Sequence, residues 1–145
     1  GNKARAFRTD ALIAAILKER DSSPIGPCAI VGDINCDPEH LKSLQHILDK
    51  ECWTDVGAVA ECWNQTPLEH TCTVAGATLA TRRDYIFTNS LLTPRIRNFR
   101  VVHANGLPTH ATLDLMIETA NFNTMTRSIK SPLSFYVKMR GDSSN

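Results

Sequence analysis

The chain has 145 residues, 42% of them hydrophobic and 21% charged, and its 16 basic and 15 acidic residues give a formal net charge of +1 at pH 7. This length allows one domain at most, and the apolar fraction is too high for global disorder. No apolar run approaches the roughly 20 residues of a membrane helix, and the near-neutral charge excludes a polycationic nucleic-acid coat. We therefore expect one globular domain with no membrane partner.

The cysteines indicate a reducing environment. They are odd in number and irregularly spaced, at positions 28, 36, 52, 62 and 72, with no C-x-x-C pair and no His pair at zinc-ligand spacing. A disulfide framework in a small secreted chain normally needs an even number. The basic segment Asn2–Arg8 is not followed by an apolar signal core. We therefore expect free thiols in an intracellular protein of the cytoplasm or nucleus.

Three regular elements are predicted in the first half of the chain. In order they are a helix over Thr9–Arg20, a buried strand over Cys28–Val31 and a helix over Pro38–Lys50. The first helix has its apolar residues on one face, and Thr9 or Asp10 can cap its start. A loop rich in Ser, Pro and Gly separates it from the strand. The second helix has Asp37 at its N-cap and Pro38 in its first turn.

The second half is predicted to contain loops followed by strands. Residues 51–80 are irregular, with one short strand at most. The predicted strands cover Asp84–Thr88, Phe99–His103 and Ala111–Glu118, and a further candidate covers Leu133–Met139. This order predicts an α/β (α+β) protein with one mixed, mostly antiparallel sheet and two helices on one face. The other face of that sheet would have no partner within the chain.

The first candidate functional residues follow the predicted buried strand. Asp33 and Asn35 come directly after it, with the small Gly32 in front of them. A carboxylate and an amide two residues apart on an extended segment point the same way, so they could hold a hard divalent cation or orient a water molecule. The alternative is a simple Asp/Asn turn leading into the next helix.

Two further candidates stand later in the chain. Asp84 opens an aromatic strand directly after Arg82 and Arg83, and His110 occupies a turn before the last predicted strand. Taken singly, Asp84 could be a capping group at a strand start and His110 a histidine of a surface loop.

Together these motifs resemble the C-terminal half of the endonuclease/exonuclease/phosphatase family, which has the DNase I-like fold. The family pattern is a strand ending in G-D-x-N, a helix, an Asp near a Trp, an R-x-D-Y-[IVF] strand and an S-D-H before the last strand. The matching segments are Gly32–Asn35, Pro38–Asp49, Trp53–Asp55, Arg82–Ile86 and Pro108–His110. The resemblance covers about residues 8–118. The stretch 81–113 is similar to endonuclease domains of some non-LTR retrotransposons.

The resemblance implies Mg²⁺- or Mn²⁺-dependent hydrolysis of phosphodiesters, most specifically by a DNA endonuclease of retroelement type. Asp33 would bind the metal and position or deprotonate the attacking water, and Asn35 would orient that water or hold the phosphate. His110 would bind the scissile phosphate, and Asp84 would fix the tautomer of His110. Such roles suit phosphoryl transfer, which needs in-line positioning and positive charge against the developing negative charge.

The resemblance also implies partners and a domain organisation. Arg82 and Arg83 would contact the phosphates of DNA or of another phosphodiester. Residues 1–120 would form the C-terminal half of a four-layered α/β sandwich, with its N-terminal half as a partner, and residues 121–145 a linker or tail.

Two departures from the family pattern keep other interpretations open. Thr109 stands where the family has the Asp of S-D-H, and the metal-binding Glu of the N-terminal half has no counterpart. We therefore expect this chain to be inactive alone. One alternative is a small-molecule phosphoesterase of the same fold, and another is a non-catalytic remnant or interaction module.

Overall fold

The computed structural model describes residues 2–74, 76, 78–104 and 106–120. The helices and strands, with η for 3₁₀ helices, are α1 (Asn2–Asp21), β1 (Ala29–Asp33), η1 (Pro38–His40), α2 (Lys42–Lys50), β2 (Thr54–Asp55), η2 (Val56–Trp63), β3 (Asp84–Thr88), η3 (Thr93–Arg95), β4 (Ile96–Val102) and β5 (Thr112–Ile117). The strand predicted over Leu133–Met139 and the tail predicted over 121–145 lie outside the described residues.

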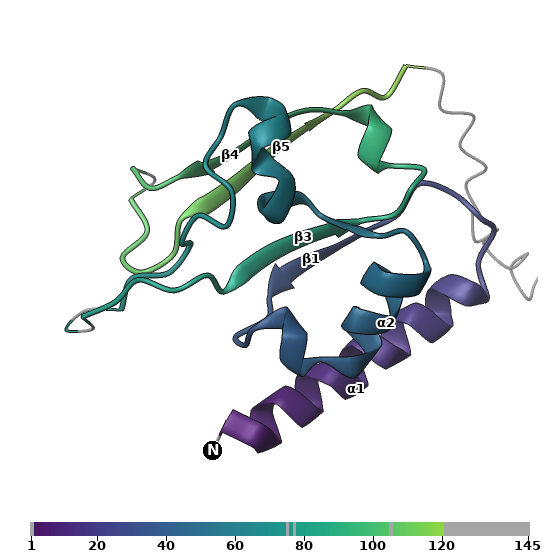
Figure 1. Ribbon diagram of the computed structural model, residues 1–145, viewed down its shortest axis with the longest axis horizontal. Coiled ribbons are helices and arrows are strands. Elements are labelled where there is room, and N and C mark those ends of the chain that lie inside the picture. The colour runs from purple at the N-terminus through teal and green to yellow at the C-terminus, as the bar shows by residue number, and fades with distance from the viewer. Residues whose placement is uncertain (1, 75, 77, 105, 121–145) are drawn as a thin grey trace, which may run out of the picture.

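The strands form two antiparallel sheets, with orders β1-β3-β2 and β4-β5. The α+β class is confirmed, but the single mixed sheet is wrong. β1 and β2 pair with the two edges of β3, so β4 pairs with β5 instead. Figure 1 shows the β4–β5 pair above β3 and the two α-helices below it.

The helical face of the first sheet carries the larger apolar core. Figure 1 shows α1 and α2 on the same side of β1 and β3, as predicted. Tyr85 and Phe87 point to this side and stack with their ring centroids 5.6 Å apart. The buried members of the cluster are Ile13, Ile30, Ile34, Leu41, Leu44, Ile47, Trp53, Tyr85 and Phe87. This face is therefore closed by the apolar stripes of the two helices.

The opposite face has a partner that the sequence did not predict. Ile86 points away from the helices, because side chains alternate along a strand. It packs in a second cluster with residues of η2 and β4, namely Val56, Ala60, Ile96 and Phe99. The expectation of an unpartnered face is thus wrong at β3. On the neighbouring β1, Val31 remains 64% exposed.

The first helix begins earlier than predicted. α1 starts at Asn2, so neither Thr9 nor Asp10 caps it. Asp10 instead lies in mid-helix, and its carboxylate accepts a hydrogen bond of 2.8 Å from the backbone N–H of Ser43. Ser43 is in the first turn of α2, where N–H groups lack partners within the helix. Asp10 therefore supplies to α2 the capping group that the sequence assigned to α1.

The second predicted helix is interrupted. The turn η1 ends at Leu41, which has the extended backbone angles φ −112° and ψ 101°, and α2 follows. Leu41 is fully buried in the helical core. Asp37 occupies the N-cap position of η1 but makes no capping hydrogen bond with its side chain. The predicted helix is thus split into η1 and α2 at the buried Leu41.

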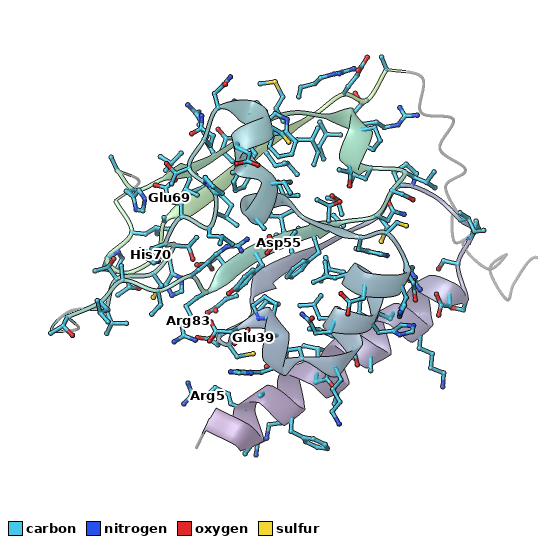
Figure 2. The ribbon with its side chains drawn as sticks, viewed as in Figure 1. Arg5, Glu39, Asp55, Glu69, His70 and Arg83 are labelled. Carbon is cyan, nitrogen blue, oxygen red and sulfur yellow. The ribbon has the colours of Figure 1, made fainter. Side chains whose placement is uncertain are left out.

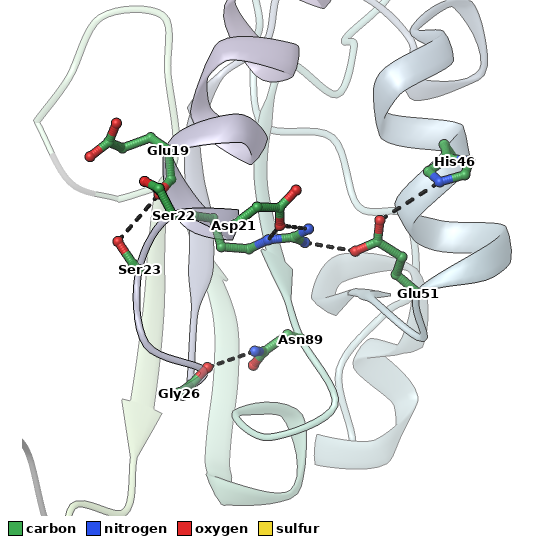
Figure 3. A network of polar contacts seen from close by, with 9 residues as sticks. Glu19, Asp21, Ser22, Ser23, Gly26, His46, Glu51 and Asn89 are labelled. Atoms are coloured by element: carbon green, nitrogen blue, oxygen red, sulfur yellow. Dashed lines mark hydrogen bonds and ion pairs between the residues drawn. The ribbon is translucent and has the colours of Figure 1, made fainter.

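Polar contacts join the ends of these elements. Arg20 Nη1 donates to Glu51 Oε2 at 2.8 Å, which links the end of α1 to the end of α2 (Figure 3). The side chain of Asn89 donates to the carbonyl of Gly26 at 2.8 Å (Figure 3). It also accepts from the N–H of Cys28 at 3.0 Å, so it holds the segment that enters β1.

Two of the predictions from composition concern the cysteines and membrane-spanning helices. All five cysteines are free thiols. Among the described residues, no helix combines the length and the apolar character that crossing a bilayer requires.

Candidate active site

The register of the first sheet brings two carboxylates together. β1 runs two residues further than predicted, so Asp33 is its last residue and pairs directly with Asp84, the first residue of β3. Directly opposed residues of an antiparallel pair project to the same face. Asp33 is exposed and Asp84 partly buried. Like charges in such a position are destabilising, which makes this end of the sheet unusual.

His110 reaches the same point from the segment before β5. Cys72 forms isolated β-bridges with Thr81 on one side and with His110 on the other. The backbone N–H of Ala111 donates to the carbonyl of Thr71 at 2.7 Å, and that of Cys72 donates to the carbonyl of Thr81 at 2.8 Å. The 71–73 segment thus connects the start of β3 to the turn that carries His110.

Thr71 is a positioning residue that sequence analysis missed. It is buried, with 2% of its surface exposed. Its Oγ1 accepts hydrogen bonds of 2.9 Å from the backbone N–H groups of both Arg83 and Asp84. Nothing in the sequence distinguishes it from other threonines, because it lies in an irregular stretch with no periodic pattern.

The three predicted acid–base residues converge. Asp33, Asp84 and His110 each offer a ligand atom, and these atoms lie within 4.8 Å of one another. His110 Nδ1 is 2.9 Å from Asp84 Oδ2, the pairing that the resemblance implies. This hydrogen bond raises the pKa of His110 above its ordinary 6.5, burial opposes the rise, and the charges of Asp84 and Asp33 add to it. The site therefore favours a protonated imidazole beside two carboxylates.

The second ring nitrogen of His110, Nε2, lies next to the thiol of Cys72. Cys72 Sγ lies 3.8 Å from His110 Nε2. Cys72 is buried, with 6% of its surface exposed. In the sequence it is one of five scattered thiols, and its spacing gives no signal for this contact. The His110 ring is thus held between Asp84 and Cys72.

Asn35 lies in the turn beyond the carboxylates. It has a left-handed backbone, with φ 56°, and its N–H donates to Asp33 Oδ1 at 3.1 Å. Asn and Asp tolerate this conformation better than most residues. The turn that formed the alternative interpretation of G-D-x-N is therefore present. Asn35 also lines a pocket beside the site, together with Arg83.

The two adjacent arginines differ in their surroundings. Arg82 points inward: its Nη1 donates to Asp55 Oδ2 at 2.7 Å, and its Cζ lies 4.3 Å from the ring centroid of Tyr85. Its side chain is only 12% exposed, so its position gives the predicted phosphate contact no support. Asp55 lies within the fold and Arg83 at its edge (Figure 2). The phosphate contact of Arg83 stays a prediction.

The converging residues fit part of a site for a hard divalent cation. Mg²⁺ is usually bound by one or two carboxylates, with water and substrate phosphate completing the shell. Asp33 and Asp84 supply such carboxylates, although one oxygen of Asp84 is engaged by His110. Thr109 uses its carbonyl to accept from the N–H of Thr73 at 2.8 Å. A second group of potential ligands, Asp37, Glu39 and His40, consists of exposed residues.

The comparisons with known proteins give this site no further support, since no family model, no curated protein and no solved structure matches the chain.

Proposed function

We propose that this chain carries the carboxylate–histidine centre of a divalent-metal-dependent phosphodiesterase that acts on nucleic acid, in the manner of the C-terminal half of a DNase I-like endonuclease. The observation that carries the proposal is the convergence of Asp33, Asp84 and His110 from three separate segments of the chain. The motif order in the sequence led us to expect this convergence.

The roles follow from position and charge. His110, protonated and held by Asp84, would bind a non-bridging oxygen of the scissile phosphate. Asp33, exposed at the end of β1, would hold or deprotonate the attacking water. A bound Mg²⁺ or Mn²⁺ would supply positive charge against the developing negative charge on the phosphate.

Two neighbours would orient the substrate. Asn35 is two residues beyond Asp33 and Arg83 directly precedes Asp84, and both side chains line the pocket beside the site. An amide and a guanidinium are suitable donors for phosphate oxygens. We assign them to positioning of the phosphodiester, not to proton transfer.

The test is metal-dependent nicking of supercoiled plasmid, with this chain and with the longest natural protein that contains it. Asp33→Asn and His110→Ala should each lower the rate by about 10²-fold or more. His103→Ala is the matched control, because His103 also pairs with a carboxylate, Glu69, at 2.8 Å but lies outside the converging group. Nicking that survives both site substitutions would refute the proposal.

The same assay separates the alternatives. Faster turnover of a soluble phosphodiester than of plasmid would favour a small-molecule phosphoesterase. If neither chain nicks plasmid or binds Mn²⁺ by electron paramagnetic resonance, the interaction module becomes the better interpretation.

One observation favours a second candidate chemistry. The imidazole of His110 contacts a thiol on one side and a carboxylate on the other. Cys72 Sγ lies 3.8 Å from Nε2, and Asp84 Oδ2 lies 2.9 Å from Nδ1. This is the order of a thiol nucleophile, a base and the acid that orients the base. Burial of Cys72 hinders access by a substrate, so we rank this candidate second. Alkylation of Cys72 by iodoacetamide at a rate well above that of the exposed Cys52 and Cys62 would support it.

A further inference from the structure

A pocket of about 690 Å³ opens beside the candidate active site. Its walls come from α1, from the turn after β1, from the start of α2 and from the residue before β3. The lining residues used below are Arg5, Phe7, Asn35, Cys36, Lys42 and Arg83. Its volume lies in the range of about 300–1,000 Å³ that small-molecule sites occupy.

The pocket and the candidate active site share a boundary. Arg83 and Asn35 line the pocket, and each is next to, or two residues from, a carboxylate of the site. The N–H of Ile34 donates to the carbonyl of Arg83 at 2.8 Å, which fixes the two boundary segments to each other. Because neighbouring residues of a strand point to opposite faces, a ligand would have to pass around this end of the β1–β3 pair to reach both places.

The pocket gathers cations without carboxylate partners. Within the described part of the chain, Arg5 and Lys42 make no ion pair or side-chain hydrogen bond, and Arg83 uses only its Nε, to Thr81 Oγ1 at 3.2 Å. Other arginines are paired: Arg20, Arg82, Arg97 and Arg100 each contact an acidic side chain. Arg5 and Arg83 lie on the same side of the molecule (Figure 2).

The acidic groups of the pocket do not cancel these cations. Asp10 and Asp37 also line it, so three cationic side chains face two carboxylates. The carboxylate of Asp10 accepts from the N–H of Ser43 at the start of α2, where the helix dipole is positive. A surplus of positive charge therefore remains, which is the condition for holding a phosphate.

The pocket also has an apolar wall. Phe7 is 75% exposed on α1, and an exposed aromatic ring is a surface on which a nucleobase can stack. Cys36 adds an uncharged thiol, since burial and the nearby Asp37 raise its pKa. Cations from three elements beside an exposed aromatic ring suit a ligand with both a phosphate and a planar base.

We propose that this pocket holds a nucleotide of a single nucleic-acid strand next to the phosphodiester at the candidate active site. Its phosphate would lie on Arg5, Lys42 and Arg83, and its base on Phe7. This inference rests on the proposed function, which it deepens by naming a strand that extends beyond the reacting phosphate as the substrate.

The experiment measures binding without cleavage. The full chain is titrated into a fluorescein-labelled single-stranded oligodeoxynucleotide in EDTA, and anisotropy is recorded over a range of salt concentrations. Arg5→Ala and Lys42→Ala should each weaken binding on the order of fivefold. Each should also reduce the slope of log K against log salt by about 0.7. Phe7→Ala should weaken binding, and Phe7→Trp should restore it.

Matched controls separate local from general effects. Arg8→Ala removes an exposed cation of the same helix that does not line the pocket, and it should leave binding unchanged. Circular dichroism melting curves show whether each variant remains folded.

Several results would overturn the inference. One is that the unmodified chain does not bind the oligonucleotide. Another is that Arg5→Ala and Arg8→Ala lower the affinity equally. A third is that inorganic phosphate or a free mononucleotide displaces the strand at a concentration equal to that of the strand. The last result would assign the pocket to a free phosphate compound. If neither this chain nor the longest natural protein that contains it nicks plasmid while the Arg5 and Lys42 effects on binding are intact, hydrolysis is refuted and the pocket assignment stands.

Discussion

The two ends of the β1–β3 strand pair use polar residues in opposite ways. At the end where Ala29 pairs with Thr88, polar side chains supply hydrogen-bond partners. Asn89 forms hydrogen bonds with three backbone groups. Thr88 Oγ1 lies 2.8 Å from Thr93 Oγ1. At the end where Asp33 pairs with Asp84, two carboxylates face each other.

This difference separates residues that stabilise the fold from the residues to which the proposed function assigns the chemistry. A directly opposed pair of like charges costs stability, and a fold tolerates such a cost where function requires it. The second end is nevertheless well fixed, because Thr71 holds the backbone of Arg83 and Asp84. We therefore expect loss of the Asn89 side chain at the first end to destabilise the fold, and loss of the Asp33 charge at the second end to stabilise it.

The largest effect is expected at the first end. Asn89→Ala should lower the free energy of unfolding by about 3 kcal/mol, because it removes partners from the N–H groups of Cys28 and Leu92 and from the carbonyl of Gly26. Urea unfolding measures this loss. Asn89→Asp is the matched variant: it keeps the acceptor oxygen and should lose clearly less. Equal losses for the two variants would contradict the assignment.

A somewhat smaller loss is expected for the threonine that holds the second end. Thr71→Val leaves two backbone N–H groups without their acceptor and should cost about 2 kcal/mol. Thr88→Val is the control at the first end, where the buried hydroxyl pairs with the hydroxyl of Thr93, and should cost about 1 kcal/mol. Thr71→Val should also shift the NMR resonances of His110, whereas Thr88→Val should not.

The first end and the core were largely predictable from the sequence. β3 matches its predicted range, Asp84–Thr88, because the residues after Asp84 are all aromatic or β-branched and have a strong strand preference. α1 was predicted too short, because the basic residues before Thr9 carry no apolar stripe. The separate β4–β5 sheet was missed, since periodicity reports which residues are buried but not which strand edge they pair with.

The second end was predictable only in its motif residues. The sequence pointed to Asp33, Asp84 and His110, and their convergence depends on contacts of the 71–73 segment that have no sequence signature. Nothing in the sequence indicated that Arg82 would pair with Asp55 while Arg83 would line the pocket. Adjacent residues of an extended segment point to opposite sides, and only the position of Asp55 decides which arginine is buried.

A gain in stability is expected at the second end. Asp33→Asn removes one of two opposed like charges and should raise the free energy of unfolding by up to about 1 kcal/mol near neutral pH. Urea unfolding near neutral pH measures this gain. A loss of stability near neutral pH would mean that Asp33 serves the fold rather than chemistry.

The smallest effect tests the link between Asp84 and His110 through its pH dependence. Because Asp84 raises the pKa of His110, the protonated imidazole stabilises the fold fully below the ordinary pKa of 6.5. That contribution disappears as the pH rises through the raised pKa. Asp84→Asn should therefore destabilise the chain below pH 6.5 and become neutral or stabilising in alkali, where relief of the repulsion from Asp33 remains.

Two measurements check this reversal. An NMR titration of the His110 ring should show its pKa falling in Asp84→Asn, and urea midpoints at about pH 5.5 and about pH 9 should bracket the change of sign. Asp114→Asn is the control, because Asp114 pairs across β4–β5 with Arg100, which keeps its charge over this range. A pH dependence equal to that of the control would mean that Asp84 and His110 are only neighbours. The reversal would instead show that Asp84 holds His110 in its protonated form, the state that the proposed phosphate contact requires.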